Sequence, residues 1–90
     1  MEKQKLFLEA LGEIQKTVVE LTACKESTYK SKEAMLYDAT YEVIYGIMEL
    51  VDGYRKADIK LDIVDRDTRK SLREGIELHD ACVEYLRYEE

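Results

Sequence analysis

His79 is the only histidine of the 90-residue chain, and Cys82 stands three residues after it. On a helix this spacing places the imidazole and the thiol on one face, which is half of the ligand set of a zinc site. Cys24, the other cysteine, would serve as a third ligand. No spacing implies a fourth, and buried cysteines commonly act as small apolar residues. We therefore expect no metal or other cofactor, and we expect His79 to be a partly buried structural residue.

Arg73 and His79 enclose five residues, and this spacing resembles the Arg-x(4–6)-His motif of HEPN-type ribonucleases, a family of helical bundles. The resemblance implies that Arg73 binds the scissile phosphate, that His79 is the acid or base, and that Glu74 is the neighbouring polar residue. It covers seven of the ninety residues. Acid–base catalysis also needs a groove for the substrate, and the sequence shows none.

Two carboxylates, Glu13 and Asp38, stand at the positions of a second motif. They resemble half of the ExxE and ExxD signature of MazG-type nucleotide pyrophosphohydrolases, in which four carboxylates hold Mg²⁺ against a nucleotide triphosphate. The other two positions hold Ala10 and Met35 here. Two carboxylates seldom hold Mg²⁺ without substrate phosphates. A metal-dependent nucleotide hydrolase or a ribonuclease is therefore the alternative to a function without catalysis.

Tyrosines favour a binding surface. Tyr37, Tyr41 and Tyr45 recur every fourth residue, which predicts a ridge of rings along one helix face. Tyrosine is enriched at protein interfaces because its ring is apolar and its hydroxyl can stay hydrated. With Met48, these three are the interface candidates. An equal alternative is that Tyr41 lies in the core and that Tyr37 and Tyr45 flank it at the edge of the core. We expect a protein-protein interaction or regulatory module that forms a homodimer or binds a protein partner through this helix.

The segment 34–52 organises the expected fold because apolar side chains surround most of its helical circumference. Its acidic positions reduce to Asp38, Glu42, Glu49 and Asp52. Such a helix needs cover on more than one side. Other helices, the segment 59–64 or a second subunit would supply that cover.

Hydrophobic periodicity predicts two further helices, and the fold class is therefore mainly α. We expect a three-helix antiparallel bundle with helices at about residues 2–22, 31–52 and 72–88. The sequence from Ser71 to Glu74 matches a capping box that would begin the last helix. Gly53 stands where a glycine commonly ends a helix.

A short β-hairpin between the second and third helices is a further expectation. Ile59, Leu61 and Ile63 alternate with polar residues, as in a half-buried strand. Residues 65–68 would form the turn. The returning arm, residues 69–73, has no β-branched side chain, so a helical continuation stays open as the alternative.

Charge is unevenly distributed in this acidic chain, which has a formal net charge of -6. Residues 55–73 hold seven basic and four acidic side chains. Because the two signs interleave, the pattern argues against a nucleic-acid-binding face. The chain shows neither a signal-peptide pattern nor a membrane-length apolar stretch, and its two cysteines do not form a disulfide framework. We expect one cytoplasmic domain over residues 1–90 that does not bind membranes.

Overall fold

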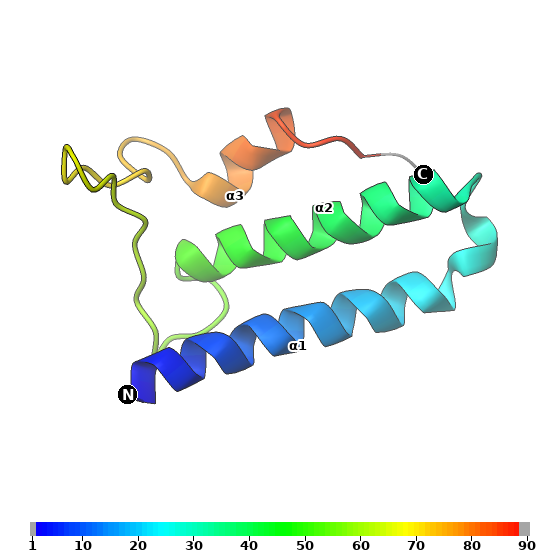
Figure 1. Ribbon diagram of the computed structural model, residues 1–90, viewed down its shortest axis with the longest axis horizontal. Helices are drawn as coiled ribbons and strands as arrows, with labels where there is room; N and C mark the ends of the chain where they lie inside the picture. Colours follow the sequence, from blue (N-terminus) through cyan, green and yellow to red (C-terminus); the bar gives the residue numbers. More distant parts are fainter. Residues whose placement is uncertain (1, 89–90) are drawn as a thin grey trace.

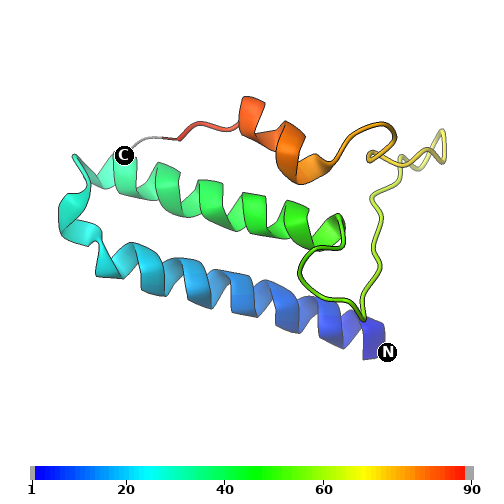
Figure 2. The same ribbon diagram turned by 180° about the vertical axis from the view of Figure 1, so that it is seen from behind.

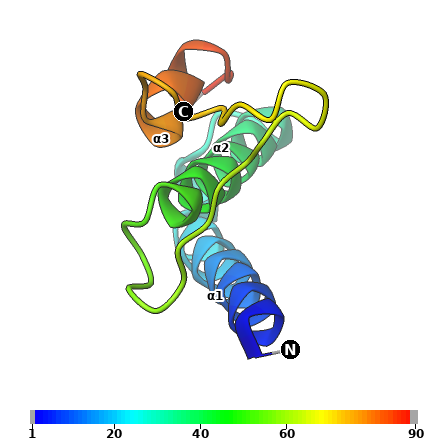
Figure 3. The ribbon, with the colours of Figure 1, turned by 90° about the vertical axis from the view of Figure 1, so that its left-hand side faces the viewer.

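Three layers make up the computed structural model, which describes residues 2–88 (Figure 1). Helix α1 (Glu2–Cys24) and helix α2 (Lys32–Val51) form an antiparallel hairpin. Short helix α3 (Leu78–Ala81) begins a C-terminal segment, residues 78–88, on the other side of α2. The view from behind and the view along the helices show the same order (Figures 2 and 3). The expectation that α2 needs cover on more than one side is therefore confirmed.

The two long helices begin and end where local chemistry predicts, within two residues of the expected bounds. The Ala34 N–H donates a 3.0 Å hydrogen bond to Ser31 Oγ, which caps the N-terminus of α2. Gly53, just beyond α2, has a φ of 91°, the left-handed conformation that commonly ends helices at glycine. The 3₁₀ turn η1 (Glu26–Thr28) lies in the connection between α1 and α2.

The hydrophobic core lies between α1 and α2. Ile14 is 2% exposed and Leu50 is fully buried. Ala10 and Val18 complete the buried cluster, and the half-buried residues Phe7, Leu11, Ala39, Val43, Ile47 and Leu61 pack against it. Full burial of a large apolar side chain is worth about 1.5–3 kcal/mol. With so few fully buried members, this core holds the hairpin together but covers only one face of α1.

A crossing segment, residues 54–64, runs from the end of α2 towards the N-terminus of α1 and then back past α2 (Figure 1). Lys3 donates a hydrogen bond to the Asp58 carbonyl, which ties this segment to the first turn of α1. Ile59 is 2% exposed, so it adds a buried apolar side chain from outside the helices. The expectation that this part of the chain covers apolar surface therefore holds for Ile59 and for half-buried Leu61.

The predicted β-hairpin is wrong, because the described residues contain no strand. Val64 and Ser71 form a single antiparallel bridge. The expected turn does exist: Asp65 Oδ1 accepts hydrogen bonds from the backbone N–H groups two and three residues on, at 2.8 and 3.1 Å. Arg69 then takes a left-handed φ of 63°, which interrupts the returning arm. The turn therefore forms without enough apolar pairing to extend it into strands.

The predicted helix over residues 72–88 is also wrong. Helix α3 has four residues, and only the 3₁₀ turn η2 (Cys82–Glu84) follows it. Ser71 does not act as a helix cap, since its Oγ accepts from the Arg73 N–H two residues on, at 3.0 Å, and not from the third residue of a helix.

Missing tertiary contacts explain why the apolar period around residue 72 does not produce a helix. Leu72 and Ile76 are each 49% exposed, so no packed face stabilises a helix there. Gly75 lies at a φ of 77°, outside the helical region. None of the described helices combines the length and apolarity that would let it cross a membrane.

Gly46 and Gly12 offer a matched pair of substitutions. A methyl group at Gly46 would lie 3.0 Å from the Ile14 side chain, whereas one at Gly12 meets nothing within 4 Å. Alanine favours a helix by about 1 kcal/mol over glycine. We expect Gly12→Ala to raise the free energy of unfolding by about that amount, and Gly46→Ala to lower it because overpacking costs about 1–3 kcal/mol. Urea unfolding measures both, and equal changes would contradict close packing of α1 on α2.

Candidate functional site

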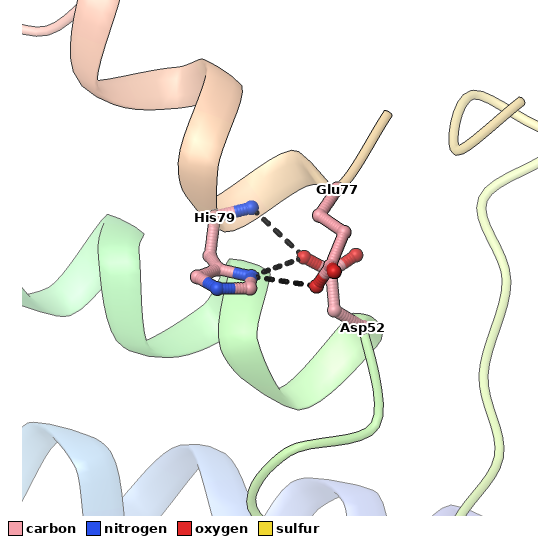
Figure 4. Close-up of side chains that lie close together, drawn as sticks. All are labelled: Asp52, Glu77 and His79. Carbon is pink, nitrogen blue, oxygen red and sulfur yellow. Dashed lines mark hydrogen bonds and ion pairs between the residues drawn. The ribbon is translucent and has the colours of Figure 1, made fainter. Parts of the chain in front are cut away.

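Asp52, at the C-terminal end of α2, is the centre of the most connected polar cluster. Its side chain is completely buried. The His79 backbone N–H donates to Asp52 Oδ2 at 2.9 Å, and the His79 ring Nδ1 lies 2.6 Å from the same oxygen (Figure 4). Arg73 Nε lies 3.0 Å from the other oxygen, Oδ1. One carboxylate therefore binds two separate parts of the chain that follows it.

The position of Asp52 explains why it needs these partners. A carboxylate at the C-terminus of a helix faces the negative end of the helix dipole, and burial adds a desolvation cost. The N–H of His79, in the first turn of α3, has no partner within its own helix and is free to donate. The electropositive start of α3 and the guanidinium of Arg73 thus compensate the end of α2.

These contacts shift both titrating groups in the directions of an ion pair. Burial alone raises the pKa of Asp52, but hydrogen bonds from the His79 backbone and ring outweigh it and hold the pKa below the ordinary 3.8. The hydrogen bond to Asp52 raises the pKa of His79 above its ordinary 6.5, although burial opposes it. Both groups are therefore charged between these two values.

Aromatic rings and further carboxylates surround the imidazole. The ring of Tyr54 lies edge-on to His79 with 4.9 Å between centroids, and that of Tyr45 at 5.7 Å. A hydrogen bond with Glu77 raises the pKa of Tyr54. Asp80 Oδ1 lies 3.5 Å from Nε2, the ring nitrogen that does not face Asp52. The histidine is thus enclosed, with 13% of its side chain exposed.

This arrangement permits two kinds of chemistry. A carboxylate on Nδ1 fixes the orientation of a histidine and supports acid–base work at Nε2. Asp52, Glu77 and His79 also bring potential metal-ligand atoms within 4.8 Å of one another. A metal ion would have to displace the two N–H donors and the guanidinium that already neutralise Asp52. The cluster is therefore built first as an ion pair between α2 and the C-terminal segment.

Arg73 and His79, the pair with the ribonuclease-like spacing, do come together. They meet on opposite oxygens of Asp52. Glu74, the third residue of that motif, is exposed. Catalysis by the pair stays a prediction, because both cationic groups point at a buried carboxylate of the chain itself.

Glu13 and Asp38, the pair with the MazG-like spacing, belong to different clusters. Glu13 lies on α1 with its carboxylate 3.6 Å from Lys56 Nζ. Asp38, whose side chain is 2% exposed, lies 3.1 Å from Lys25 Nζ and accepts a hydrogen bond from the Tyr29 hydroxyl. The described contacts therefore give these two carboxylates different cationic partners and no shared metal cluster.

The Asp38 cluster fastens the connection between the long helices. The hydrogen bond with Asp38 raises the pKa of Lys25. Burial, followed by the hydrogen bond with Asp38, raises the pKa of Tyr29. Both partners come from the loop after α1, so a buried charge on α2 holds that loop against the helix. Asp52 likewise holds a separate segment of the chain against α2, near the other end of the helix.

The cysteines do not assemble a zinc site. Cys82 Sγ donates to the His79 carbonyl at 3.5 Å, within the C-terminal segment. Burial raises the pKa of this thiol, which favours the protonated form that metals do not bind. Cys24 is exposed at the end of α1, and the ligand cluster found among residues 2–88 contains no cysteine.

The tyrosine row of α2 contacts the C-terminal segment of the same chain. Arg87 lies over the Tyr37 ring at 4.6 Å, and the Tyr88 ring lies 5.0 Å from that of Tyr41. Tyr45, stacked on Tyr41 at 6.2 Å, meets the edge of His79. Met48, the fourth interface candidate, is half-buried. Their role towards a partner stays a prediction, because every contact described for them is internal.

No protein-family model matches the chain, and no curated protein or solved structure matches it significantly. The site is therefore interpreted from its geometry.

Sequence reasoning missed Asp52 as the centre of the cluster. One signal could have found it. An acid in the last turn of an apolar helix, directly before a terminating glycine, opposes the helix dipole and calls for a partner from elsewhere in the chain.

The Asp52–His79 pair makes stability depend on pH in both directions. Because the pKa of His79 is raised, the contribution of His79 to stability is complete below pH 6.5 and is lost as the pH rises through the pKa of His79 in the folded state. Because the pKa of Asp52 is lowered, the contribution of Asp52 to stability is present above pH 3.8 and is lost as the pH falls through the pKa of Asp52 in the folded state. We expect thermal unfolding temperature to be highest between these pH values, and His79→Gln to flatten the alkaline decline. An unchanged alkaline limb in His79→Gln would contradict the assignment.

Removal of the central charge tests the cluster itself. Asp52→Asn removes the buried counter-charge that Arg73 and His79 share, and we expect it to lower the free energy of unfolding by about 3 kcal/mol. The control is Asp80→Asn, a neighbouring carboxylate whose side chain is 75% exposed and whose loss should change little. Denaturant unfolding compares the two, and similar losses from both would refute a special role for Asp52.

Proposed function

We propose that this protein is a small interaction module that self-associates through the open face of the α1–α2 hairpin. The observation that carries the proposal is an apolar groove between these helices, left open by the rest of the described chain. Two helical hairpins that pack face to face make a four-helix bundle, which is a common way to complete such a core. A two-fold dimer needs only one self-complementary patch.

The groove lies near the ends of α1 and α2 that face the η1 turn and has a volume of about 290 Å³. Val19 on α1 is 59% exposed and Leu36 on α2 is 54% exposed. Its other lining residues are Thr22, Ala23, Glu26, Met35 and Ala39. Leu8, three turns before Val19 on α1, is 62% exposed. Large apolar side chains that gather on one face in this way mark interaction surfaces.

The shape of the chain supports the same proposal. The radius of gyration is 14.9 Å, with extents of 44 × 29 × 19 Å. A compact domain of this length has a radius of gyration of about 12 Å. Because α2 is the middle layer, α1 packs against α2 and not against α3 (Figure 3). A second copy on the hairpin would give a thicker and better buried core.

The tyrosine row is a less accessible surface for the same role. A partner on Tyr37, Tyr41 and Tyr45 would have to displace the C-terminal segment and its ring contacts. That displacement would also break the buried ion pair of Asp52. The open hairpin face requires no such rearrangement, so we place self-association there.

The enzyme alternatives receive less support from the geometry. The carboxylates of the nucleotide-hydrolase pattern lie in separate clusters, and Arg73 and His79 are both engaged with Asp52. Release of pyrophosphate from nucleotide triphosphates that is lost in Glu13→Ala with Asp38→Ala, or cleavage of RNA that is lost in His79→Ala, would favour a hydrolase over the interaction module.

Light scattering on the purified protein tests self-association. We expect a mass of twice the monomer, and we expect Leu36→Glu to give monomers because it places a charge in the apolar interface. Leu72→Glu is the matched control, since Leu72 is 49% exposed but lies outside the hairpin. A wild-type monomer at high concentration, or dimers that persist in Leu36→Glu, would reject the proposed face.

A further inference from the structure

A cleft with a volume of about 510 Å³ lies between the C-terminal end of α2 and the crossing segment. Small-molecule sites commonly have volumes of about 300–1,000 Å³. The cleft has an apolar floor and a basic rim. The floor is formed by Val51, Ile59 and Leu61, and the rim by Lys56, Lys60 and Arg73. It is distinct from the apolar groove between α1 and α2.

Charge is the unusual property of this cleft. Three cationic side chains and one carboxylate, Asp52, line it, a local net charge of +2 in a chain whose net charge is -6. Asp52 is turned away from a ligand, because its oxygens face Arg73 and His79. The basic stretch 55–73 of the sequence therefore supplies the positive charge that the fold gathers here.

The two lysines of the rim are available to an anion, and Arg73 stays partly exposed beside its Asp52 partner. Lys60 forms no ion pair with any residue between 2 and 88 for which contacts are described, and its side chain is exposed. Lys56 lies 3.6 Å from Glu13, whose side chain is 65% exposed. Such a surface pair is weak and exchanges readily. Arg73 keeps 34% of its side chain exposed beside Asp52.

We propose that this cleft binds a small organic phosphate, with the phosphate among the three cations and an apolar or planar body on the floor. A phosphate monoester dianion compensates more of the positive charge of the lining residues than a carboxylate does. Arginine and lysine are the side chains that recognise phosphate in proteins. The net charge of -6 disfavours a nucleic-acid polymer, whereas the local positive charge of the cleft favours a single phosphate group.

Titration with phenyl phosphate, inorganic phosphate and benzoate tests the proposal by NMR. We expect phenyl phosphate to bind saturably and to shift the methyl signals of Val51, Ile59 and Leu61. Benzoate keeps the ring but carries one charge, and inorganic phosphate lacks the ring, so both should bind more weakly. Benzoate that binds as tightly would overturn the phosphate assignment, and inorganic phosphate that binds as tightly would overturn the role of the floor.

Variants locate the site. We expect Lys56→Met with Lys60→Met to weaken phenyl phosphate binding by about tenfold. Lys16→Met with Lys32→Met removes the same charge from exposed positions on α1 and α2, and should change the affinity by less than about twofold. Circular dichroism confirms that both variants are folded. No saturable binding by the wild type, or equal losses in the two variants, would overturn the site.

Discussion

A buried carboxylate at the end of α2 decides where the last third of the chain lies. Asp52 faces the negative end of its own helix dipole with its side chain completely buried, an arrangement that is unfavourable without compensating charge. The chain must therefore return to this point, and it does so twice, once with Arg73 and once with the start of α3. The crossing segment, the cleft and the cover of the tyrosine row all follow from that return.

The second constraint is the apolar circumference of α2. One side packs on α1 and the opposite side is covered by the C-terminal segment (Figure 1), but Leu36 of α2 stays 54% exposed. Helix α1 likewise has exposed apolar side chains, Leu8 and Val19. Apolar side chains of both long helices therefore stay exposed, and the proposed self-association would bury them.

Sequence reasoning predicted what is local and missed what is distant. The two long helices and the terminating Gly53 follow from side-chain patterns within a few residues. Leu72 and Ile76 carry a helical period as well, but no partner surface meets them, and period alone does not make a helix.

The polar clusters show the same division between local and distant information. Cys82 and His79 could be paired from their spacing, but the bond from His79 to Asp52 joins residues 27 positions apart. Lys25 and Tyr29 converge on Asp38 only because the chain reverses between α1 and α2. For each cluster the sequence did show one sign, an acidic residue (Asp38 or Asp52) within or at the end of an apolar helix. Such a residue indicates that a compensating partner exists but does not identify it.

The separation of 27 residues between Asp52 and His79 also bears on how the molecule forms. The α1–α2 hairpin closes through a short connection, whereas docking of α3 must first close a long and largely irregular loop, which carries a larger entropic cost. Contacts of low sequence separation form early in folding, and those that close long loops form late. We therefore expect the α1–α2 hairpin to form first and the Asp52 ion pair to form last. Amides in the C-terminal layer should accordingly exchange with solvent through local openings that leave the hairpin intact.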